Sequence, residues 1–296
     1  MSNPSSGKSP TKVYLIPGFL TELPLPREGS REGTLARLQR LLQSLIESSD
    51  PLQLIDGRGW VSSLSAALPE EAQGSIELVS WPSRRLFELL PTLTPILRLL
   101  RRQRLTLFGR AALPQLLLSL GQSAWTLQQL WVAAREAADE ASVQLAAQLR
   151  AGHPAGEPIL LIGHSLGARL ALKAALRCVE NPVYVLALAP AMREQELIGE
   201  AKRHSSNFAR LLEVGYSPDD RILQWLYPLA ELGGALPFSQ SSEALGSVGP
   251  RVGDLCIPLP CSPMGHLSYM DGLSRLLPRS QIWPLLNSMK SFRSPK

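Results

Sequence analysis

The stretch that decides the fold is Ile159-Leu160-Leu161-Ile162-Gly163-His164-Ser165-Leu166-Gly167. Its first four residues are apolar without polar alternation, which is typical of a strand buried on both faces of a parallel sheet. Leu and Ala dominate from Leu166 to Val179, which predicts a helix directly after the strand. The sequence therefore predicts a strand, a tight turn and a helix in immediate succession.

The turn itself, Gly163-His164-Ser165-Leu166-Gly167, has the pattern of a nucleophile elbow. Such a turn forces an unfavourable backbone angle on the serine, and Gly163 and Gly167 leave the room it needs to close. The serine hydroxyl then lies in the crevice where α/β proteins bind ligands, at the positive end of the following helix. We expect Ser165 to be a catalytic nucleophile; a purely structural turn is the alternative.

Working outward from the elbow, strand-like and helix-like segments alternate along the chain, which predicts an α/β fold with a doubly wound, mostly parallel sheet. Pro258 should confine the last strand to an edge of the sheet or shorten it. The first residues, 1–11, offer nothing to bury and are predicted to be a disordered lead-in, followed by one domain over 12–290. Further strands are expected at Val13–Ile16, 76–81, Val183–Leu188, 211–216 and 255–259, and further helices at 34–46 and 126–150.

An insertion at about 84–125 interrupts this alternation and is predicted to be a helical cap. Between Arg84 and Arg110 it carries seven arginines and one acidic residue, Glu88, among many leucines and several prolines. A cationic, leucine-rich segment suits a membrane surface contacted through 84–120, or a lid over an apolar pocket. Cap helices packed on the core, with their arginines in solvent, are the alternative.

A serine nucleophile needs a base, and the chain has four histidines. His153 precedes the elbow strand, His164 adjoins the serine without facing its hydroxyl, and His204 lies in a polar stretch. His266 is the one that comes late enough for the chain order serine, acid, histidine that this arrangement requires. We therefore predict His266 as the base.

The acid is expected after a strand that follows the elbow, where Asp219 and Asp220 stand together. Asp220 is preferred and Asp219 is the alternative; either could also serve as an ordinary turn or cap residue. For the oxyanion hole, the expected backbone N–H donors are those of Leu166 and Phe19. Leu20 is the alternative to Phe19, and a common Pro-Gly turn is the structural alternative for that loop.

The composition further limits the class of protein that the sequence can encode. At 296 residues and 45% hydrophobic content, the chain can bury a large core, and a formal charge of +5 without an aromatic-interleaved basic stripe gives no reason to expect a nucleic-acid partner. Cys178, Cys256 and Cys261 fit neither a disulfide framework nor a zinc motif, so buried thiols in a reducing compartment are expected, with no metal and no cofactor. No secretory signal or uninterrupted apolar span is present, which predicts a cytoplasmic protein that contacts membranes at most peripherally.

Taken together, these pieces resemble the α/β-hydrolase superfamily of serine esterases and lipases. They are most similar to the hydrolase core of the transmembrane and coiled-coil domain-containing protein family of animals and fungi, over about residues 12–285. The pieces are Ile16-Pro17-Gly18-Phe19, the strand ending at Trp81, the Ala-rich helix before the elbow, and residues 163–169, 219–223 and 265–269.

The resemblance implies a catalytic triad of Ser165, Asp220 and His266. It also implies that the insertion corresponds to the family's membrane-associated segment, although here it is shorter and rich in arginine. The predicted function is cleavage of a carboxylic ester, with an acyl lipid as one substrate class, through an acyl-enzyme on Ser165. A thioesterase or acyltransferase with the same triad, and a non-catalytic binding or membrane-docking module, are the alternatives.

Overall fold

The computed structural model of the chain describes residues 12–18, 58–68, 73, 75–82, 122–204, 210–232, 243–251 and 255–289. The expected lead-in at 1–11, the expected helix at 34–46 and residues 84–121 of the expected cap insertion lie outside these ranges. Residues 122–125 of the expected insertion belong to a long helix that begins at Gln122.

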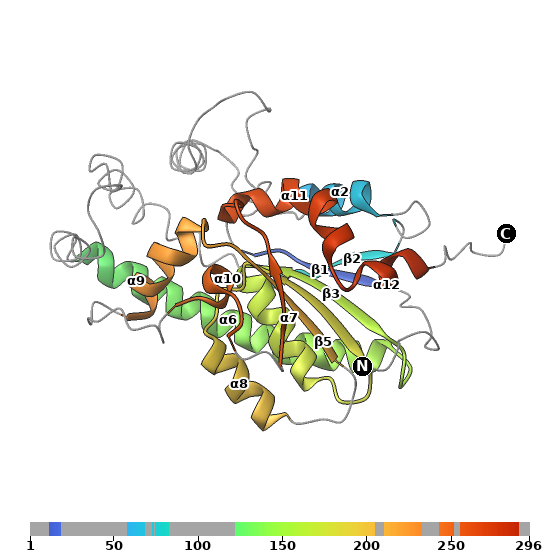
Figure 1. Cartoon of the computed structure of the whole chain (residues 1–296). Helices are drawn as coiled ribbons and strands as arrows, with labels where there is room; N and C mark the ends of the chain where they lie inside the picture. Colours follow the sequence, from blue (N-terminus) through green and yellow to red (C-terminus); the bar gives the residue numbers. More distant parts are fainter. Residues whose placement is uncertain are drawn as a thin grey trace.

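Within the described residues, six strands form one parallel sheet in the order β2-β1-β3-β4-β5-β6 (Figure 1). The sheet confirms the predicted doubly wound α/β architecture, and β6, which contains Pro258, confirms its predicted edge position. The strands are β1 (Val13–Ile16), β2 (Ile76–Leu78), β3 (Ile159–His164), β4 (Val183–Leu188), β5 (Arg210–Tyr216) and β6 (Ile257–Pro260).

Helices cover both faces of this sheet: α2, α11 and α12 lie on one face, and α6, α7 and α8 on the other (Figure 1). Their bounds are α2 (Arg58–Ala67), α6 (Gln122–Gly152), α7 (Leu166–Arg177), α8 (Glu194–Arg203), α9 (Tyr227–Leu232), α10 (Leu245–Val248), α11 (Tyr269–Leu276) and α12 (Trp283–Ser288). Shorter helical turns are η4 (Ile222–Leu226, a π-helical turn), η6 (His266–Ser268) and η7 (Leu277–Arg279).

The strands divide the apolar core into two layers, because successive side chains of a strand point to opposite faces. In β3, Leu160 and Ile162 pack with α2 and α11, whereas Ile159 and Leu161 pack with α6 and α7. All four side chains are fully buried. This explains why the strand reads as an unbroken apolar run: both of its faces are covered.

The strand order places a topological switch point between β1 and β3. From β1 the chain crosses to β2 on one side and then to β3 on the other, after which each strand is added outward. Connections that depart in opposite directions leave a crevice outside the carboxyl ends of the strands, where open α/β sheets bind ligands. Ser165 follows the last residue of β3 and therefore lies at the carboxyl end of that strand, next to the switch point.

Most predicted segments correspond to observed ones, with shifts at their ends. The strand expected at 76–81 ends at Leu78, and the side chain of Trp81 beyond it donates a hydrogen bond to the carbonyl of Pro17 (2.9 Å). The helix expected at 126–150 is α6, which is longer at both ends. Helix α2 was not predicted, although Trp60, Leu64 and Leu68 recur at a helical spacing of four and are buried.

Candidate active site

Ser165 joins β3 to α7 in a strained turn. Its backbone has φ 56° and ψ −122°, a sparsely populated region that costs on the order of 1–3 kcal/mol for a residue with a side chain. Its carbonyl accepts hydrogen bonds from the N–H groups of Ala168 and Arg169 (3.1 Å each) and Ala191 (3.2 Å). Its own N–H donates to the carbonyl of Leu188 (2.9 Å), so the surrounding backbone holds the turn in place.

Three glycines allow this turn to pack against the sheet. A Cβ on Gly163 would lie 2.6 Å from the carbonyl oxygen of Gly167, and one on Gly167 would lie 2.2 Å from that of Ile16. A Cβ on Gly18, after β1, would lie 2.3 Å from the carbonyl oxygen of His164 and 2.6 Å from Ser165 Cβ. The predicted close approach at these positions is therefore present, and any larger residue would push β1, β3 and α7 apart.

His266 reaches the serine from the segment after β6. Its Nε2 lies 3.0 Å from Ser165 Oγ, and the side chains of both residues are almost completely buried. His266 opens the short turn η6, immediately after Gly265. Gly265 has φ −84° and ψ 167°, an extended backbone conformation that any residue adopts.

Asp220 completes the array and, unlike Asp219, contacts the histidine. Its Oδ2 lies 2.7 Å from His266 Nδ1, and its Oδ1 accepts the N–H of Leu223 (3.0 Å) at the start of η4. The carboxyl is fully buried, with both oxygens engaged. Asp219 is exposed and accepts a hydrogen bond from the hydroxyl of Ser262.

These contacts define the proton positions. A carboxylate can only accept, so His266 donates its Nδ1–H to Asp220 and presents the lone pair of Nε2 to the hydroxyl of Ser165. The three side chains come from the segments after β3, β5 and β6, at the carboxyl edge of one parallel sheet. Such an array can remove a proton from the serine as it attacks a carbonyl carbon.

One of the two expected oxyanion donors belongs to the described residues. Leu166 is the first residue of α7, where backbone N–H groups have no acceptor within the helix, beside the serine. Phe19 and its alternative Leu20 lie outside the described residues. Gly18, which precedes them, is buried against the elbow.

His153 and His204 pair with residues outside this array, and the cysteines are buried. His153 accepts or donates a hydrogen bond with the Tyr14 hydroxyl (2.7 Å) at the start of the sheet, and His204 pairs with Glu200 at the end of α8. Burial raises the pKa of the Cys256 thiol to about 12 and that of Cys261 to about 11, so both stay protonated. All three cysteines are buried thiols, as the sequence predicts.

His164 is the polar residue whose part in the site the sequence analysis missed. Its side chain does not contact the neighbouring hydroxyl, as expected, but its Nε2 bonds the backbone carbonyl of His266 at 3.0 Å. It is 1% exposed, and burial lowers its pKa well below the usual histidine range. Its position at the end of a fully apolar strand is the signal that could have marked it as a buried group.

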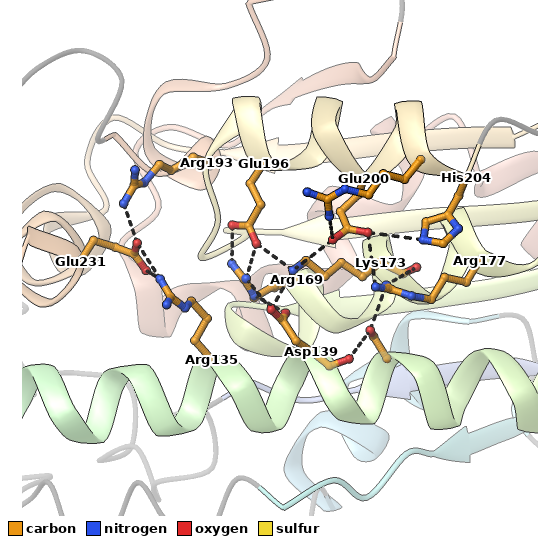
Figure 2. Close-up of polar contacts among 12 residues, drawn as sticks. Arg135, Asp139, Arg169, Lys173, Arg177, Arg193, Glu196, Glu200, His204 and Glu231 are labelled. Atoms are coloured by element: carbon orange, nitrogen blue, oxygen red, sulfur yellow. Dashed lines mark hydrogen bonds and ion pairs between the residues drawn. The ribbon is translucent and has the colours of Figure 1, made fainter.

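A second polar group that was not predicted lies where the elbow helix α7 packs against α6 and α8 (Figure 2). Arg169, one turn after the serine, bonds both Asp139 on α6 and Glu196 on α8 through two nitrogens each. Lys173 reaches the same two carboxylates at 2.8 and 2.7 Å. Arg169 and Lys173 are at most 3% exposed, and their spacing of four in an otherwise Leu- and Ala-rich helix is the signal for such a cluster.

The described residues form neither a metal-binding cluster nor a membrane-spanning helix. Among the described residues, no three histidine, cysteine or acidic side chains gather in a way that could hold a metal ion. In that same part of the chain, no helix combines the length and apolar character needed to cross a bilayer.

The fold and the site define a parallel α/β protein with a buried serine, histidine and aspartate joined by hydrogen bonds at its switch point. The chain belongs to the family described as "Protein of unknown function (DUF726)", whose model matches residues 94–243. That match contains Ser165 and Asp220, whereas His266 lies beyond it. Comparison with curated proteins and with solved structures gives no match.

Proposed function

We propose that the protein is a serine hydrolase that cleaves a carboxylic ester through an acyl-enzyme on Ser165. The observation that carries this proposal is the unbroken chain of two hydrogen bonds, Ser165 Oγ to His266 Nε2 at 3.0 Å and His266 Nδ1 to Asp220 Oδ2 at 2.7 Å. The chain order serine, acid, histidine and the parallel sheet are those of the α/β-hydrolases, the superfamily to which we assign the fold.

In the acylation step, Ser165 Oγ attacks the ester carbonyl carbon while its proton passes to His266 Nε2. The carbonyl π electrons move to oxygen, and the oxyanion accepts the N–H of Leu166; the second donor expected from the sequence is the N–H of Phe19. The tetrahedral intermediate then expels the alkoxide, which takes the proton from His266 and leaves as the alcohol. Asp220 accepts the Nδ1–H throughout and stabilises the imidazolium that exists between these proton transfers.

Deacylation repeats the sequence with water. His266 Nε2 accepts a proton from the attacking water, the second tetrahedral intermediate forms, and Ser165 Oγ departs with that proton as the carboxylic acid is released. A thiol ester as substrate, or an alcohol in place of water, would use the same steps, so thioesterase and acyltransferase activities fall within the same proposal. An acyl lipid as substrate rests on the leucine- and arginine-rich composition of residues 84–120.

A panel of p-nitrophenyl esters of increasing acyl length tests the ester and the acyl preference together. We expect the wild type to release p-nitrophenol with an optimum at one chain length, and Ser165→Ala to abolish this release while keeping the wild-type melting temperature. A rate in Ser165→Ala equal to that of the wild type would remove Ser165 from the mechanism.

A further inference from the structure

His164 is enclosed by aromatic rings from three other segments of the fold. Its ring centroid lies 4.7 Å from that of His266, 5.0 Å from that of Trp60 on α2 and 5.6 Å from that of Tyr269 at the start of α11. Trp60, His266 and Tyr269 are themselves at most 3% exposed. His164 therefore joins the end of the central strand β3 to the layer of helices that carries the catalytic histidine.

The side chain of His164 makes one hydrogen bond among the described residues, and this bond defines which ring nitrogen carries the hydrogen. A carbonyl oxygen can only accept, so Nε2 carries the hydrogen and donates it to the carbonyl of His266 (3.0 Å). Nδ1 has no hydrogen-bond partner among the described residues. No described carboxylate thus stabilises a protonated ring, and burial and the adjoining His266 keep the pKa of His164 well below its usual range.

We propose that His164 is a positioning residue for the reaction assigned to Ser165: its Nε2–H holds the backbone of His266 so that the His266 ring meets both Ser165 and Asp220. This inference rests on the proposed function. It adds to the triad a residue that touches no reacting atom but is covalently adjacent to the nucleophile and hydrogen-bonded to the backbone of the base.

The geometry explains why this hydrogen bond matters for the position of the His266 ring. His266 lies in a three-residue turn, and its ring must satisfy two hydrogen bonds in opposite directions at once. His164 and Ser165 are consecutive residues. Any shift of the elbow therefore moves the nucleophile together with the residue that is hydrogen-bonded to the backbone of His266. Displacement of a catalytic group by about 1 Å can lower a rate by about 100-fold.

A neutral ring also suits this position electrostatically. The reaction places a positive charge on His266, whose ring lies 4.7 Å from that of His164. A second cation at this distance, in a buried site, would oppose that charge. His164 provides a hydrogen-bond donor without a charge, which a lysine or an arginine could not do.

The test compares three substitutions at His164 in the full chain. His164→Phe keeps an aromatic ring but lacks the donor; His164→Gln can place an amide N–H near the position of Nε2; His164→Asn has the same chemistry but its shorter side chain does not reach. The matched control is His153→Phe, which removes another buried histidine hydrogen bond, to Tyr14, at the opposite end of the sheet.

Two readouts are measured: the rate at which a fluorophosphonate labels Ser165, and the low-field proton resonance of His266 Nδ1–H, which reports its bond to Asp220 without requiring activity. We expect His164→Phe and His164→Asn to slow labelling by about tenfold or more and to broaden or lose the resonance. We expect His164→Gln to recover most of both, and His153→Phe to lower the melting temperature while leaving both at the wild-type level.

The inference would be overturned if His164→Gln and His164→Asn gave the same labelling rate and the same resonance. It would also be overturned if His164→Phe kept the labelling rate and the resonance of the wild type. If His164→Phe fails to fold, the Gln and Asn variants decide. A wild type that folds and shows the resonance but is never labelled would contradict the proposed hydrolase instead, and the resonance in the variants would then decide the role of His164 alone.

Discussion

At the scale of single residues, the choice between two neighbouring aspartates shows what the sequence could and could not provide. Asp219 and Asp220 are adjacent residues of the same type in the same loop. The sequence therefore allows only a preference for one of them as the acid of the triad. The fold separates them: Asp220 is fully buried and bonds His266, whereas Asp219 faces outward and bonds Ser262. His164 is excluded as the base because its side chain does not face the neighbouring hydroxyl. Its observed partner, the carbonyl of His266, is 102 residues away in the sequence, where no local pattern indicates it.

The two aspartates therefore make a matched pair of variants. Asp220→Asn should reduce ester turnover by up to about 10⁴-fold, because the amide can hold His266 in the tautomer that protonates Nε2. Asp219→Asn should leave turnover within about twofold of the wild type, since a surface hydrogen bond contributes little to the site. Steady-state kcat/KM values for the best p-nitrophenyl ester provide the measurement, and equal losses in the two variants would contradict the assignment of the acid.

Gly167 provides a second comparison at this scale. Both Gly167 in α7 and Gly199 in α8 are helical, so alanine should favour either helix by about 0.5–1 kcal/mol. At Gly199 no atom lies within 4 Å of the added Cβ, whereas at Gly167 the carbonyl oxygen of Ile16 lies 2.2 Å from it.

We expect Gly199→Ala to raise the free energy of unfolding and Gly167→Ala to lower it by about 1–3 kcal/mol or more, because backbone must move. Urea unfolding of both variants measures this difference. A stabilised Gly167→Ala would show that the close packing of α7 against β1 is not needed.

At the scale of elements, the elbow helix α7 has two kinds of contacts. Leucine and alanine side chains pack on the sheet, as the sequence predicts, while Arg169 and Lys173 bind carboxylates of α6 and α8 (Figure 2). The periodicity of α7 indicated a helix but not the partners of its cations, because these come from segments about 30 residues away on either side. Each of the two buried cations thus has carboxylate partners, as buried charges require.

Removal of one cation from this cluster should therefore be costly. Arg169→Met leaves Asp139 and Glu196 with Lys173 alone and should lower the free energy of unfolding by about 3 kcal/mol. The control is Lys12→Met, which removes an ion pair to Glu77 whose side chains are about half exposed (52% and 50%) and should change stability by less than about 1 kcal/mol. Urea midpoints compare the two, and a similar small change in both would mean that the buried cluster stabilises no more than a surface pair.

For the whole molecule, the order of strands and helices along the chain could largely be predicted from the sequence. A parallel sheet that is covered on both faces needs apolar strands, and turn-forming residues follow each apolar run. The central elements β3, α7 and β4 were predicted within two residues of their ends. The strand order depends on pairing between segments that are distant in the sequence, and so does the position of three strand ends at one edge of the sheet. No local sequence pattern indicates such pairing. Of the predicted site, Ser165, Asp220 and His266 lie together, and Phe19 lies outside the described residues.

The charge cluster also predicts how the stability of the molecule responds to acid. Burial alone would raise the pKa of Asp139 and of Glu196, but Arg169 and Lys173 outweigh it and lower both pKa values below the usual 3.8 and 4.5. The unfolded chain then takes up protons at a higher pH than the folded protein does. The stabilisation from these carboxylates is thus complete above the unfolded pKa values and is lost as pH falls through the lowered folded ones.

We expect the urea midpoint of the wild type to decrease between about pH 5 and about pH 3, and to decrease less in Asp139→Asn, which lacks one of these titrating groups. Burial raises the pKa of Glu213 and gives it the opposite pH dependence, but it is common to both proteins and cancels in the comparison. Parallel pH profiles for the wild type and the variant would show that the cluster does not govern acid stability.

The central claim, a serine activated by His266, is tested most directly by covalent labelling. The full-length protein is treated with a fluorophosphonate probe, and the modified peptide is identified by mass spectrometry. We expect one adduct per chain, on Ser165, with labelling lost in Ser165→Ala and strongly slowed in His266→Ala. A folded wild-type protein that takes up no probe, or an adduct on a serine other than Ser165, would contradict it.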